Sequence, residues 1–197
     1  MKIGFALTSS YCTLEKVLLE IKNLVDCGYD VIPIVQPSIL NTDTRFGKGE
    51  YFKNCIEKIT NNKIVSTIVD AEKFGPAEPL DALVIAPATG NFIAKLANGI
   101  TDNPVCMATK ATIRNGSPII IGVSTNDALG INGVNIMKLL NTKGIYFIPF
   151  YQDDHIKKPN SLIANYELLT NTLESALKKE QLQPVLDNKV KIKKLEK

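Results

Sequence analysis

Polar residues that could bind a small anion or a cofactor gather in four short segments of the sequence. Each segment follows an apolar run of the kind that forms a buried strand. The segments are Thr8-Ser9-Ser10, Pro37-Ser38, Thr89-Gly90-Asn91 and Ser124-Thr125-Asn126. Their hydroxyl, amide and backbone N–H groups can hydrogen-bond a phosphate. Because ligands of parallel sheets bind beyond the carboxyl ends of the strands, we expect all four segments on one ligand-binding edge.

The stretch from Asp81 to Asn103 is the strongest candidate for holding a phosphorylated cofactor. Its apolar run Ala82–Ala86 predicts a buried strand. A tight turn, Pro87–Gly90, leads to a short helix from about Asn91 to Asn98, which Gly99 ends. A strand, a turn of small residues and a helix N-terminus together form a socket of N–H groups that suits an anion.

The first hydroxyl-rich turn, Thr8-Ser9-Ser10, matches neither the G-x-G-x-x-G of a dinucleotide site nor the G-x-x-x-x-G-K-[ST] of a P-loop. It can still hydrogen-bond a single phosphate, and flavin mononucleotide (FMN) sites often have turns of this kind. An ordinary polar turn with Thr13 as a helix cap is an equally good interpretation.

Cationic residues offer a second kind of site. Arg45 and Lys48 lie in a glycine-flanked loop, where a fork-shaped guanidinium could hold a carboxylate. Solvated surface side chains are the alternative for both residues. Lys95, in the predicted helix after Thr89, is open to the same two interpretations.

The sequence argues against a metal site and against a hydrolase triad. Its single histidine, His155, stands directly beside Asp153 and Asp154, and this contiguous spacing is not that of a zinc site. A surface loop is the better interpretation. With one histidine and no nucleophile elbow, a Ser/His/Asp enzyme is excluded.

The elements that would position these residues alternate between strand and helix. The first strand is expected at Ile3–Leu7, an amphipathic helix from Leu14 to Val25 and a second strand at Asp30–Gln36. An irregular loop then runs from Pro37 to Gly49. Later segments are predicted as helices around Phe52–Ile59, Val69–Lys73, Val105–Ile113 and Val134–Leu140, strands at Pro118–Val123 and Ile145–Phe150, and a long last helix carrying Leu162, Tyr166, Leu169, Leu173 and Ala176 on one face. This pattern predicts an α/β fold with three αβα layers around a parallel, Rossmann-like or flavodoxin-like sheet.

Composition indicates one soluble domain over residues 1–180, followed by a basic C-terminal tail, 181–197. The chain has 197 residues, 45% hydrophobic and 22% charged, with a net charge of +3. Residues 187–197 hold five lysines against Asp187 and Glu196, so the basic excess lies in the tail. We therefore expect no nucleic-acid partner. We expect no membrane span, and the four unpaired-looking cysteines fit a reducing, cytoplasmic location.

One motif resembles a known family. Pro87-Ala88-Thr89-Gly90-Asn91, followed by Ala94-Lys95, Ala97, Gly99 and Asp102, resembles the P-A-[ST]-x-N-x-x-A-K-x-A-x-G-x-x-D signature of the FMN-binding flavoproteins related to cysteine-type decarboxylases. The resemblance implies an FMN site. Its residues would be Thr8, Ser9, Ser10, Ser38, Ala88, Thr89 and Asn91, with Ser124 and Thr125 nearby.

Further segments resemble a narrower family, the B subunits of dipicolinate synthases. They are Thr44–Glu50, Ser124–Gly130 and Lys157–Leu162, with Ile3–Thr13 and Gln181–Val185 at the two ends. That family implies oxidation of a dihydrodipicolinate to dipicolinate in the mother cell of a spore-forming bacterium. Its partner would be an A subunit that resembles a nicotinamide-dependent dehydrogenase, through which NADP would enter. For such a small dicarboxylate substrate we assign Arg45, Lys48 and Asn126 as binding residues, and the catalytic residue stays unassigned.

Two departures from the wider family limit what it implies. Its decarboxylases carry a histidine about eight residues before the aspartate of the central strand, where this chain has Lys73. Their P-x-M-N-x-x-M segment is replaced by Ser124–Gly130. Decarboxylation is therefore not expected. The alternatives are a non-catalytic scaffold for the A subunit and a decarboxylase-like or prenyltransferase-like flavoprotein. Relatives of this fold commonly form trimers or larger assemblies, so we expect a homo-oligomer.

Overall fold

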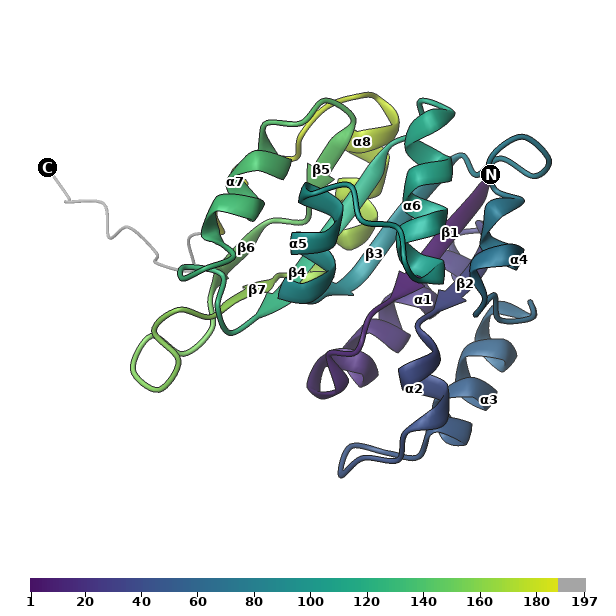
Figure 1. The fold of residues 1–197 in the computed structure, drawn as a ribbon, viewed down its shortest axis with the longest axis horizontal. Helices are drawn as coiled ribbons and strands as arrows, with labels where there is room; N and C mark the ends of the chain where they lie inside the picture. The colour runs from purple at the N-terminus through teal and green to yellow at the C-terminus, as the bar shows by residue number, and fades with distance from the viewer. Residues whose placement is uncertain (188–197) are drawn as a thin grey trace, which may run out of the picture.

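Alternating apolar strands and amphipathic helices build a sheet with helices on both faces (Figure 1), in a computed structural model that describes residues 1–187. The strands are β1 Lys2–Leu7, β2 Asp30–Val35, β3 Ala82–Ala88, β4 Ile119–Thr125, β5 Ile145–Phe147, β6 Phe150–Gln152 and β7 Leu162–Ala164. The helices are α1 Leu14–Asp26, α2 Pro37–Asn41, α3 Gly49–Thr60, α4 Ile68–Glu72, α5 Gly90–Ala97, α6 Pro104–Arg114, α7 Gly133–Leu140 and α8 Leu169–Leu177. Two 3-10 turns, Tyr11–Thr13 and Tyr166–Leu168, precede α1 and α8.

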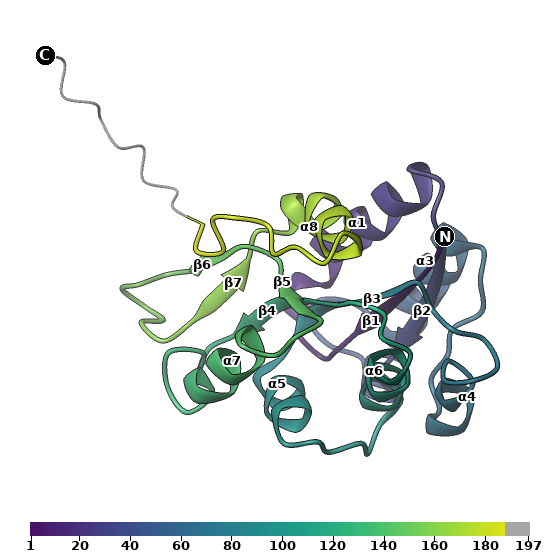
Figure 2. The same ribbon diagram turned by 90° about the horizontal axis from the view of Figure 1, so that it is seen from above.

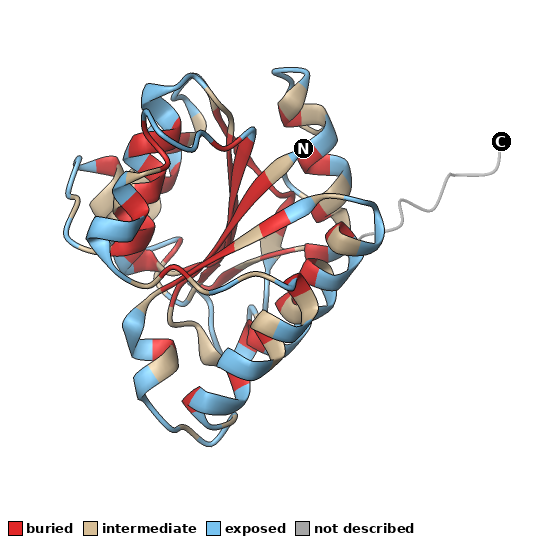
Figure 3. Cartoon of the chain, turned by 90° about the vertical axis from the view of Figure 1, so that its right-hand side faces the viewer, coloured by how far each residue is buried: buried red, intermediate tan, exposed pale blue. Residues whose placement is uncertain are grey.

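Within residues 1–187 the sheet has seven strands, in the order β2-β1-β3-β4-β7-β6, with β5 also paired to β4. The pairs among β2, β1, β3, β4 and β5 are parallel, whereas β7 pairs antiparallel with β4 and β6. The strands β1, β3 and β4 are buried almost throughout (Figure 3), which explains their continuous apolar sequences. The predicted α/β fold with a parallel sheet is confirmed.

Helices cover the two faces of the sheet as separate layers (Figure 2). One hydrophobic cluster joins α1, α3 and α8 to one face, and another joins α4, α5, α6 and α7 to the other. In α1 the buried residues are Leu14, Val17, Ile21 and Leu24, which share one helical face as their spacing predicts. The three-layer arrangement is therefore confirmed as well.

The predicted irregular loop Pro37–Gly49 is wrong in its first part. Residues Pro37–Asn41 form the short helix α2, with proline in its first turn. Proline suits this place because its fixed backbone angle matches the helix and the first turn needs no N–H donor there. The remaining residues connect α2 to α3.

The prediction for residues 145–176 is also wrong in two places. The expected strand Ile145–Phe150 is divided into β5 and β6, and Pro149, which has no N–H to donate, lies between them. Leu162 belongs to β7, where Leu162 and Ala164 are buried and Ile163 is half-buried. The last helix therefore begins only at Leu169. Apolar residues two apart fit a strand, and a short run does not separate that spacing from a helical one.

Two strands extend further than expected, so the turns that follow them are shorter. Strand β3 continues through Pro87 and Ala88, which were predicted as a turn, and β4 continues through Ser124 and Thr125. Continuous pairing extends β4, because Ser124 and Thr125 bond to β7. Their side chains are thereby fixed by the sheet.

The chain after α8 returns to the sheet. The Gln181 side chain accepts the Phe147 amide hydrogen at 2.8 Å and donates to the Phe147 carbonyl at 2.7 Å. Asp187 donates its amide hydrogen to the carbonyl of Phe150 at 2.9 Å. Residues 188–197, with most of the predicted basic tail, lie outside the described residues, and the domain boundary at residue 180 stays a prediction. Within residues 1–187, no helix is long and apolar enough to cross a membrane.

Candidate functional site

Thr8 joins the loop after β1 to the loop after β3. Its hydroxyl is fully buried and donates to the carbonyl of Pro87 at 2.7 Å. The same oxygen accepts the amide hydrogen of Thr89 at 3.0 Å and lies 3.2 Å from the Thr89 hydroxyl. Because these bonds occupy its hydroxyl, Thr8 aligns the two loops and is not among the described residues that line the cavity between them.

Two serine hydroxyls meet where β1 and β2 end. Ser9 Oγ lies 2.5 Å from Ser38 Oγ, and Ser9 also donates to the side-chain oxygen of Gln36 at 3.0 Å. The Tyr11 hydroxyl donates to the Ser38 carbonyl at 2.9 Å and fixes this arrangement. The turns that were predicted to share one edge are thus in contact.

A cavity of about 420 Å³ opens between these strand ends and the β6–β7 hairpin. Its volume is in the range of small-molecule sites. Of the residues named from the sequence, it is lined by Ser9, Ser10, Thr89, Ser124, Thr125 and Asn126. The other lining residues are Cys12, Thr13, Asp127, Asp153, Lys158, Ser161, Leu162 and Ile163. Most of these groups can donate or accept hydrogen bonds, so the cavity suits a polar ligand.

Ser10 and Ser124 connect the two sides of the cavity. Their hydroxyl oxygens are 2.9 Å apart, and the Thr13 hydroxyl donates to the carbonyl of Ser10 at 2.9 Å. Ser124 is paired in the sheet with Ile163 of β7. The sheet pairing therefore sets the position of a hydroxyl that faces the loop after β1.

A carboxylate, that of Asp127, lies at the N-terminus of α5. A Cβ built on Gly90, the first residue of α5, would come within 2.7 Å of Asp127 Oδ1 and of Thr125 Oγ1, and 2.6 Å of Asn132 Nδ2. Thr125 donates to Asp127 Oδ1 at 2.5 Å and Asn132 to Oδ2 at 2.7 Å. The helix dipole favours a carboxylate in this position. An anionic ligand would have to share the position with Asp127.

The remaining residues of the signature motif have different environments. Ala88 is fully buried in β3, and Thr89 caps α5 by accepting the amide hydrogen of Phe92 at 3.4 Å. Asn91 is exposed in the first turn of α5 and is not among the described residues that line the cavity. Lys95 is paired with Asp102 at 2.6 Å, which lowers the pKa of the Asp102 carboxyl.

Arg45 and Lys48 do not line the cavity. Both are exposed in the connection between α2 and α3, and the Arg45 guanidinium lies 4.8 Å from the centre of the Phe46 ring. This stacking holds the guanidinium on its own loop. Their role as a carboxylate clamp stays a prediction.

The β6–β7 hairpin supplies a whole wall of the cavity that was not predicted from the sequence. Asp153, Lys158 and Ser161 line the cavity from this hairpin. The segment was predicted as a loop leading into a helix, so nothing placed it beside the ends of β1 and β3. The signal that could have found it is the resemblance of Lys157–Leu162 to the B-subunit family, which was used for recognition alone.

Tyr166 lies behind this wall with an unpartnered hydroxyl. Among the described residues, its oxygen is the buried side-chain polar atom that has no hydrogen-bond partner. Burial raises the pKa of Tyr166 well above its ordinary value. The hydroxyls of Ser124 and Thr13 lie close enough to favour the phenolate, which acts against this rise, but neither meets the geometry of a hydrogen bond. The tyrosine therefore stays protonated beneath the cavity.

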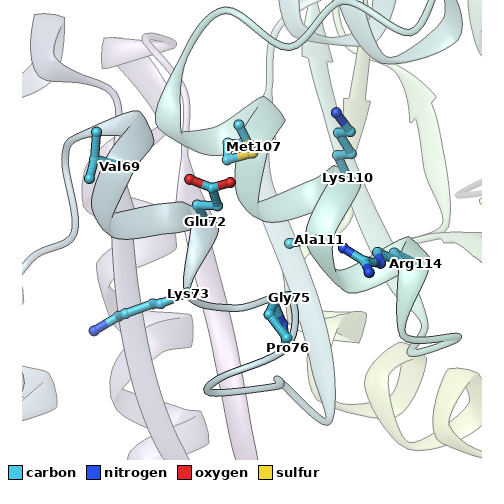
Figure 4. A pocket seen from close by; sticks show the side chains of 9 residues that line it. All are labelled: Val69, Glu72, Lys73, Gly75, Pro76, Met107, Lys110, Ala111 and Arg114. Carbon is cyan, nitrogen blue, oxygen red and sulfur yellow. The ribbon is translucent and has the colours of Figure 1, made fainter.

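A second cavity, of about 390 Å³, lies between α4 and α6 (Figure 4). Its charged lining residues are Glu72, Lys73, Lys110 and Arg114. Lys73, which stands where the decarboxylases have histidine, lies 3.6 Å from Glu78 here. Because this cavity borders Gly75 and Pro76, before β3 begins, it is on the amino side of the sheet and away from the polar turns.

His155 is exposed in the β6–β7 hairpin. Among residues 1–187, the structure brings together no group of three or more His, Cys, Asp or Glu side chains that could hold a metal ion. Cys12, Cys27, Cys55 and Cys106 are all free thiols. The candidate site is therefore the cavity of hydroxyls, amides, two carboxylates and a lysine.

Comparison with known proteins shows the family of this chain. A model of the family described as Flavoprotein matches residues 1–174. The B subunit of the dipicolinate synthase of Bacillus subtilis (strain 168) is 54% identical over 185 residues, which cover 94% of this chain and 92% of that protein. The crystal structure of the dipicolinate synthase B subunit from Bacillus halodurans C is 52% identical, with a TM-score of 0.89 over 96% of this chain and 97% of that one.

A more distant solved structure shares the fold alone. It is the FMN-dependent cysteine decarboxylase SpaF, with 19% identity and a TM-score of 0.58 over 89% of this chain and 95% of that chain. The resemblance to FMN-binding flavoproteins and to the B-subunit family, expected from the motifs, is confirmed by these relatives.

Proposed function

Because the chain belongs to the flavoprotein family, we propose that its cavity at the carboxyl edge of the sheet binds FMN, and that the chain is the B subunit of a dipicolinate synthase. The observation that carries the proposal is the meeting of three hydroxyl-rich strand ends, marked by the Ser9–Ser38 and Ser10–Ser124 contacts. The proposed reaction is the oxidation of dihydrodipicolinate to dipicolinate. Its product, dipicolinate, comes from the name of the relatives that are more than half identical to this chain.

Ser9, which lines the cavity, and Ser38, which contacts Ser9 but is not itself a lining residue, would hold the phosphate of a flavin nucleotide. Their hydroxyls are 2.5 Å apart and, among the described residues, no carboxylate is bonded to either one. The N-terminus of α5 suits the phosphate less well, because Asp127 lies against Gly90 there. A phosphate dianion beside a carboxylate would be repelled. The uncharged ring system would instead lie near Thr89 and Asn91.

Ser10, Ser124 and Thr125 would orient the ring and the substrate. Ser10 and Ser124 form a hydroxyl pair on the cavity wall, and the sheet fixes Ser124 and Thr125 through their pairing with β7. Such fixed donors need little reorganisation when a ligand binds. Asn126, exposed at the cavity, can turn its amide toward a substrate carboxylate.

The chemistry requires an electron acceptor and a base. Bound FMN would supply the electron acceptor. Conversion of the dihydropyridine ring to the aromatic pyridine removes a hydride and a proton, and the aromatic product makes the step favourable. Asp127 is the residue we assign to the proton, because its two oxygens are held by Thr125 and Asn132 and it lines the cavity. A positioned carboxylate of this kind typically contributes about 10²–10⁴-fold to a rate.

The A subunit is the proposed partner, and it would bring NADP. Either the flavin on this chain takes the hydride or the nicotinamide of the A subunit does, with this chain shaping the site. The proposed location is the cytoplasm of the mother cell, and a homo-oligomer is the proposed assembly. Nucleic-acid and membrane partners are not part of the proposal.

The experiment that tests the flavin site compares FMN with riboflavin, which lacks the phosphate. The purified chain, reconstituted with FMN, should show the visible absorbance of a bound flavin. Ser9→Ala and Ser38→Ala should lower the affinity for FMN toward that for riboflavin and leave the riboflavin affinity unchanged. If neither flavin binds, the cofactor proposal is wrong. If both affinities fall equally, the phosphate lies elsewhere.

The experiment that tests the reaction uses the assembled two-subunit enzyme. Dipicolinate formation from dihydrodipicolinate should need this chain, and Asn91→Ala should slow it by weakening flavin binding.

A scaffold role for the A subunit is the second candidate, favoured by the two carboxylates that line the cavity. A scaffold predicts a colourless protein and unchanged dipicolinate formation in Asn91→Ala. A decarboxylase or prenyltransferase role lacks such support, since Lys73 lies in the other cavity and pairs with Glu78.

A further inference from the structure

The β6–β7 hairpin presents a lysine to the candidate site. Lys158 lines the cavity, and its ammonium group lies 3.2 Å from the carboxylate of Asp153, which lines the same cavity. We propose that the Lys158 ammonium group binds a carboxylate of the substrate. Asp153 pairs with this ammonium group in the absence of substrate, and the substrate carboxylate takes the place of Asp153. The proposal rests on the proposed function for the identity of the substrate as a pyridine dicarboxylate.

The backbone of the hairpin holds Lys158 in place. Lys158 donates its amide hydrogen to the Asp154 carbonyl at 2.7 Å, and its own carbonyl accepts from Ser161 at 3.0 Å. Asp153 donates its amide hydrogen to the Ser161 carbonyl at 3.4 Å. Ser161 is buried at the start of β7, which is paired with β4. Both members of the ion pair are therefore attached to the sheet edge that forms the cavity.

The charges of the cavity single out Lys158. Its charged lining residues among those described are Asp127, Asp153 and Lys158. An anion that enters a cavity with two carboxylates is repelled unless it meets a cation. Lys158 supplies that cation within the cavity, whereas the Arg45 guanidinium is stacked on Phe46 outside it.

The ion pair with Asp153 can be exchanged at small cost. The Lys158 and Asp153 side chains are 50% and 36% exposed. Ion pairs this exposed contribute little to stability, because water screens them. A substrate carboxylate offers the lysine the same kind of partner, and it also separates Asp153 from the incoming negative charge. The ammonium group has three donors, so a carboxylate can be bound before Asp153 leaves.

The neighbouring Lys157 provides a matched control. It carries the same charge on the same exposed hairpin, and the structure does not place it among the residues that line the cavity. A long-range effect of charge would be the same for both lysines. A direct contact with the substrate would distinguish them.

The test measures binding of dipicolinate (pyridine-2,6-dicarboxylate) to the full chain by calorimetry, with and without FMN. Lys158→Gln should weaken binding about tenfold, as expected for loss of a charge-assisted hydrogen bond to a carboxylate. Lys157→Gln should leave the dissociation constant unchanged, and Lys158→Arg should keep most of the affinity. Asp153→Asn should bind dipicolinate severalfold more tightly, because the competing carboxylate is gone.

Equal losses in the Lys158→Gln and Lys157→Gln variants, no loss in either, or weaker binding in Asp153→Asn would overturn the proposal. A wild-type chain that does not bind dipicolinate would overturn it too. An FMN titration of the same variants separates this result from the flavin proposal. If no flavin binds but dipicolinate binding depends on Lys158, the carboxylate site stands without the cofactor site. If flavin binds and Lys158→Gln does not change the affinity for dipicolinate, the flavin proposal is kept and the proposal for Lys158 is wrong.

Discussion

The hydroxyl of Thr8 accepts the amide hydrogen of Thr89 across a sequence separation of 81 residues. It also donates to Pro87, so one buried oxygen aligns the ends of β1 and β3. Both loops contribute hydroxyls to the cavity, since Ser9 and Ser10 directly follow Thr8. The alignment of the candidate site therefore depends on a side chain that does not itself line the cavity.

Thr8→Val should destabilise the protein and loosen the site. The substitution keeps the shape of the side chain but leaves the Thr89 amide and the Pro87 carbonyl without their partner. An unsatisfied buried group costs about 1–3 kcal/mol. Urea unfolding should show a loss of this order, and FMN affinity should fall with it. Thr8→Ser keeps the hydroxyl, so it should lose clearly less unfolding free energy than Thr8→Val. Equal losses in the two variants would contradict the explanation.

Gly90→Ala should disturb the carboxylate at the start of α5. The added methyl group would lie within 2.7 Å of side-chain atoms of Thr125, Asp127 and Asn132. These three side chains are joined by hydrogen bonds to the Asp127 carboxylate. Overpacking of this kind costs about 1–3 kcal/mol. The change in unfolding free energy should be of that order, and the neighbouring exposed Asn91→Ala should change it little. A Gly90→Ala variant with wild-type stability would show that the three side chains can move apart easily.

Asp127→Asn should slow the proposed oxidation without unfolding the chain. The new side-chain oxygen can still accept from Asn132, and its amide group can donate to Thr125, so the local bonds are kept. If Asp127 takes the substrate proton, the turnover number should fall by about 10²–10⁴-fold. FMN affinity should stay close to that of the wild type. The measurement is the turnover number of wild type and variant, each assembled with the proposed A subunit. An unchanged turnover number would mean that Asp127 does not take the substrate proton.

Tyr166→Phe should make the protein slightly more stable near neutral pH and change its response to alkali. The hydroxyl is buried without a hydrogen-bond partner, so its removal relieves a desolvation cost of about 1 kcal/mol. In the wild type, burial raises the pKa of Tyr166 above its ordinary value of 10.0. The unfolded chain releases this proton above pH 10 while the folded chain keeps it, so this contribution to stability is intact below pH 10 and decreases above it.

Urea unfolding of the wild type and Tyr166→Phe at several pH values checks this prediction. The difference in stability should widen in favour of the variant above pH 10, by up to about 1.4 kcal/mol per pH unit. Other tyrosines titrate in both proteins and cancel in the comparison. A difference that stays constant with pH would mean that Tyr166 ionises freely in the folded state.

Local sequence patterns were enough to predict the parallel strands β1 to β4 and the polar segments that follow them. The α1 face of Leu14, Val17 and Ile21 and the continuous apolar run of β3 each report on burial by themselves. The hydroxyl segments were placed correctly because parallel strands carry their carboxyl ends to the same edge. The spacing of apolar residues within one helix or strand can be recognised in a window of about ten to twenty residues.

The missing part of the site depends on pairing between distant strands. Lys158 reaches the cavity through the attachment of β7 to β4. Asp127 is held locally by Thr125 and Asn132, but the residue that it lies against, Gly90, belongs to a distant part of the chain. A run such as Leu162–Ala164 does not state in its own sequence which strand it will join. Because so short an apolar run fits a strand and a helix equally well, Leu162 was predicted as part of the last helix, whereas it belongs to β7.

The Ser10–Ser124 contact forms late in folding, and with it the candidate site. The two residues are 114 positions apart, and the wall that holds Lys158 comes later still in the chain. Contacts of such long range are slow to form and appear only when most of the topology is in place. A newly made chain thus cannot assemble the cavity until its last strands have docked. Binding of a ligand in this cavity would therefore indicate that the whole chain has been made and folded. Chains truncated before β7 should not bind it.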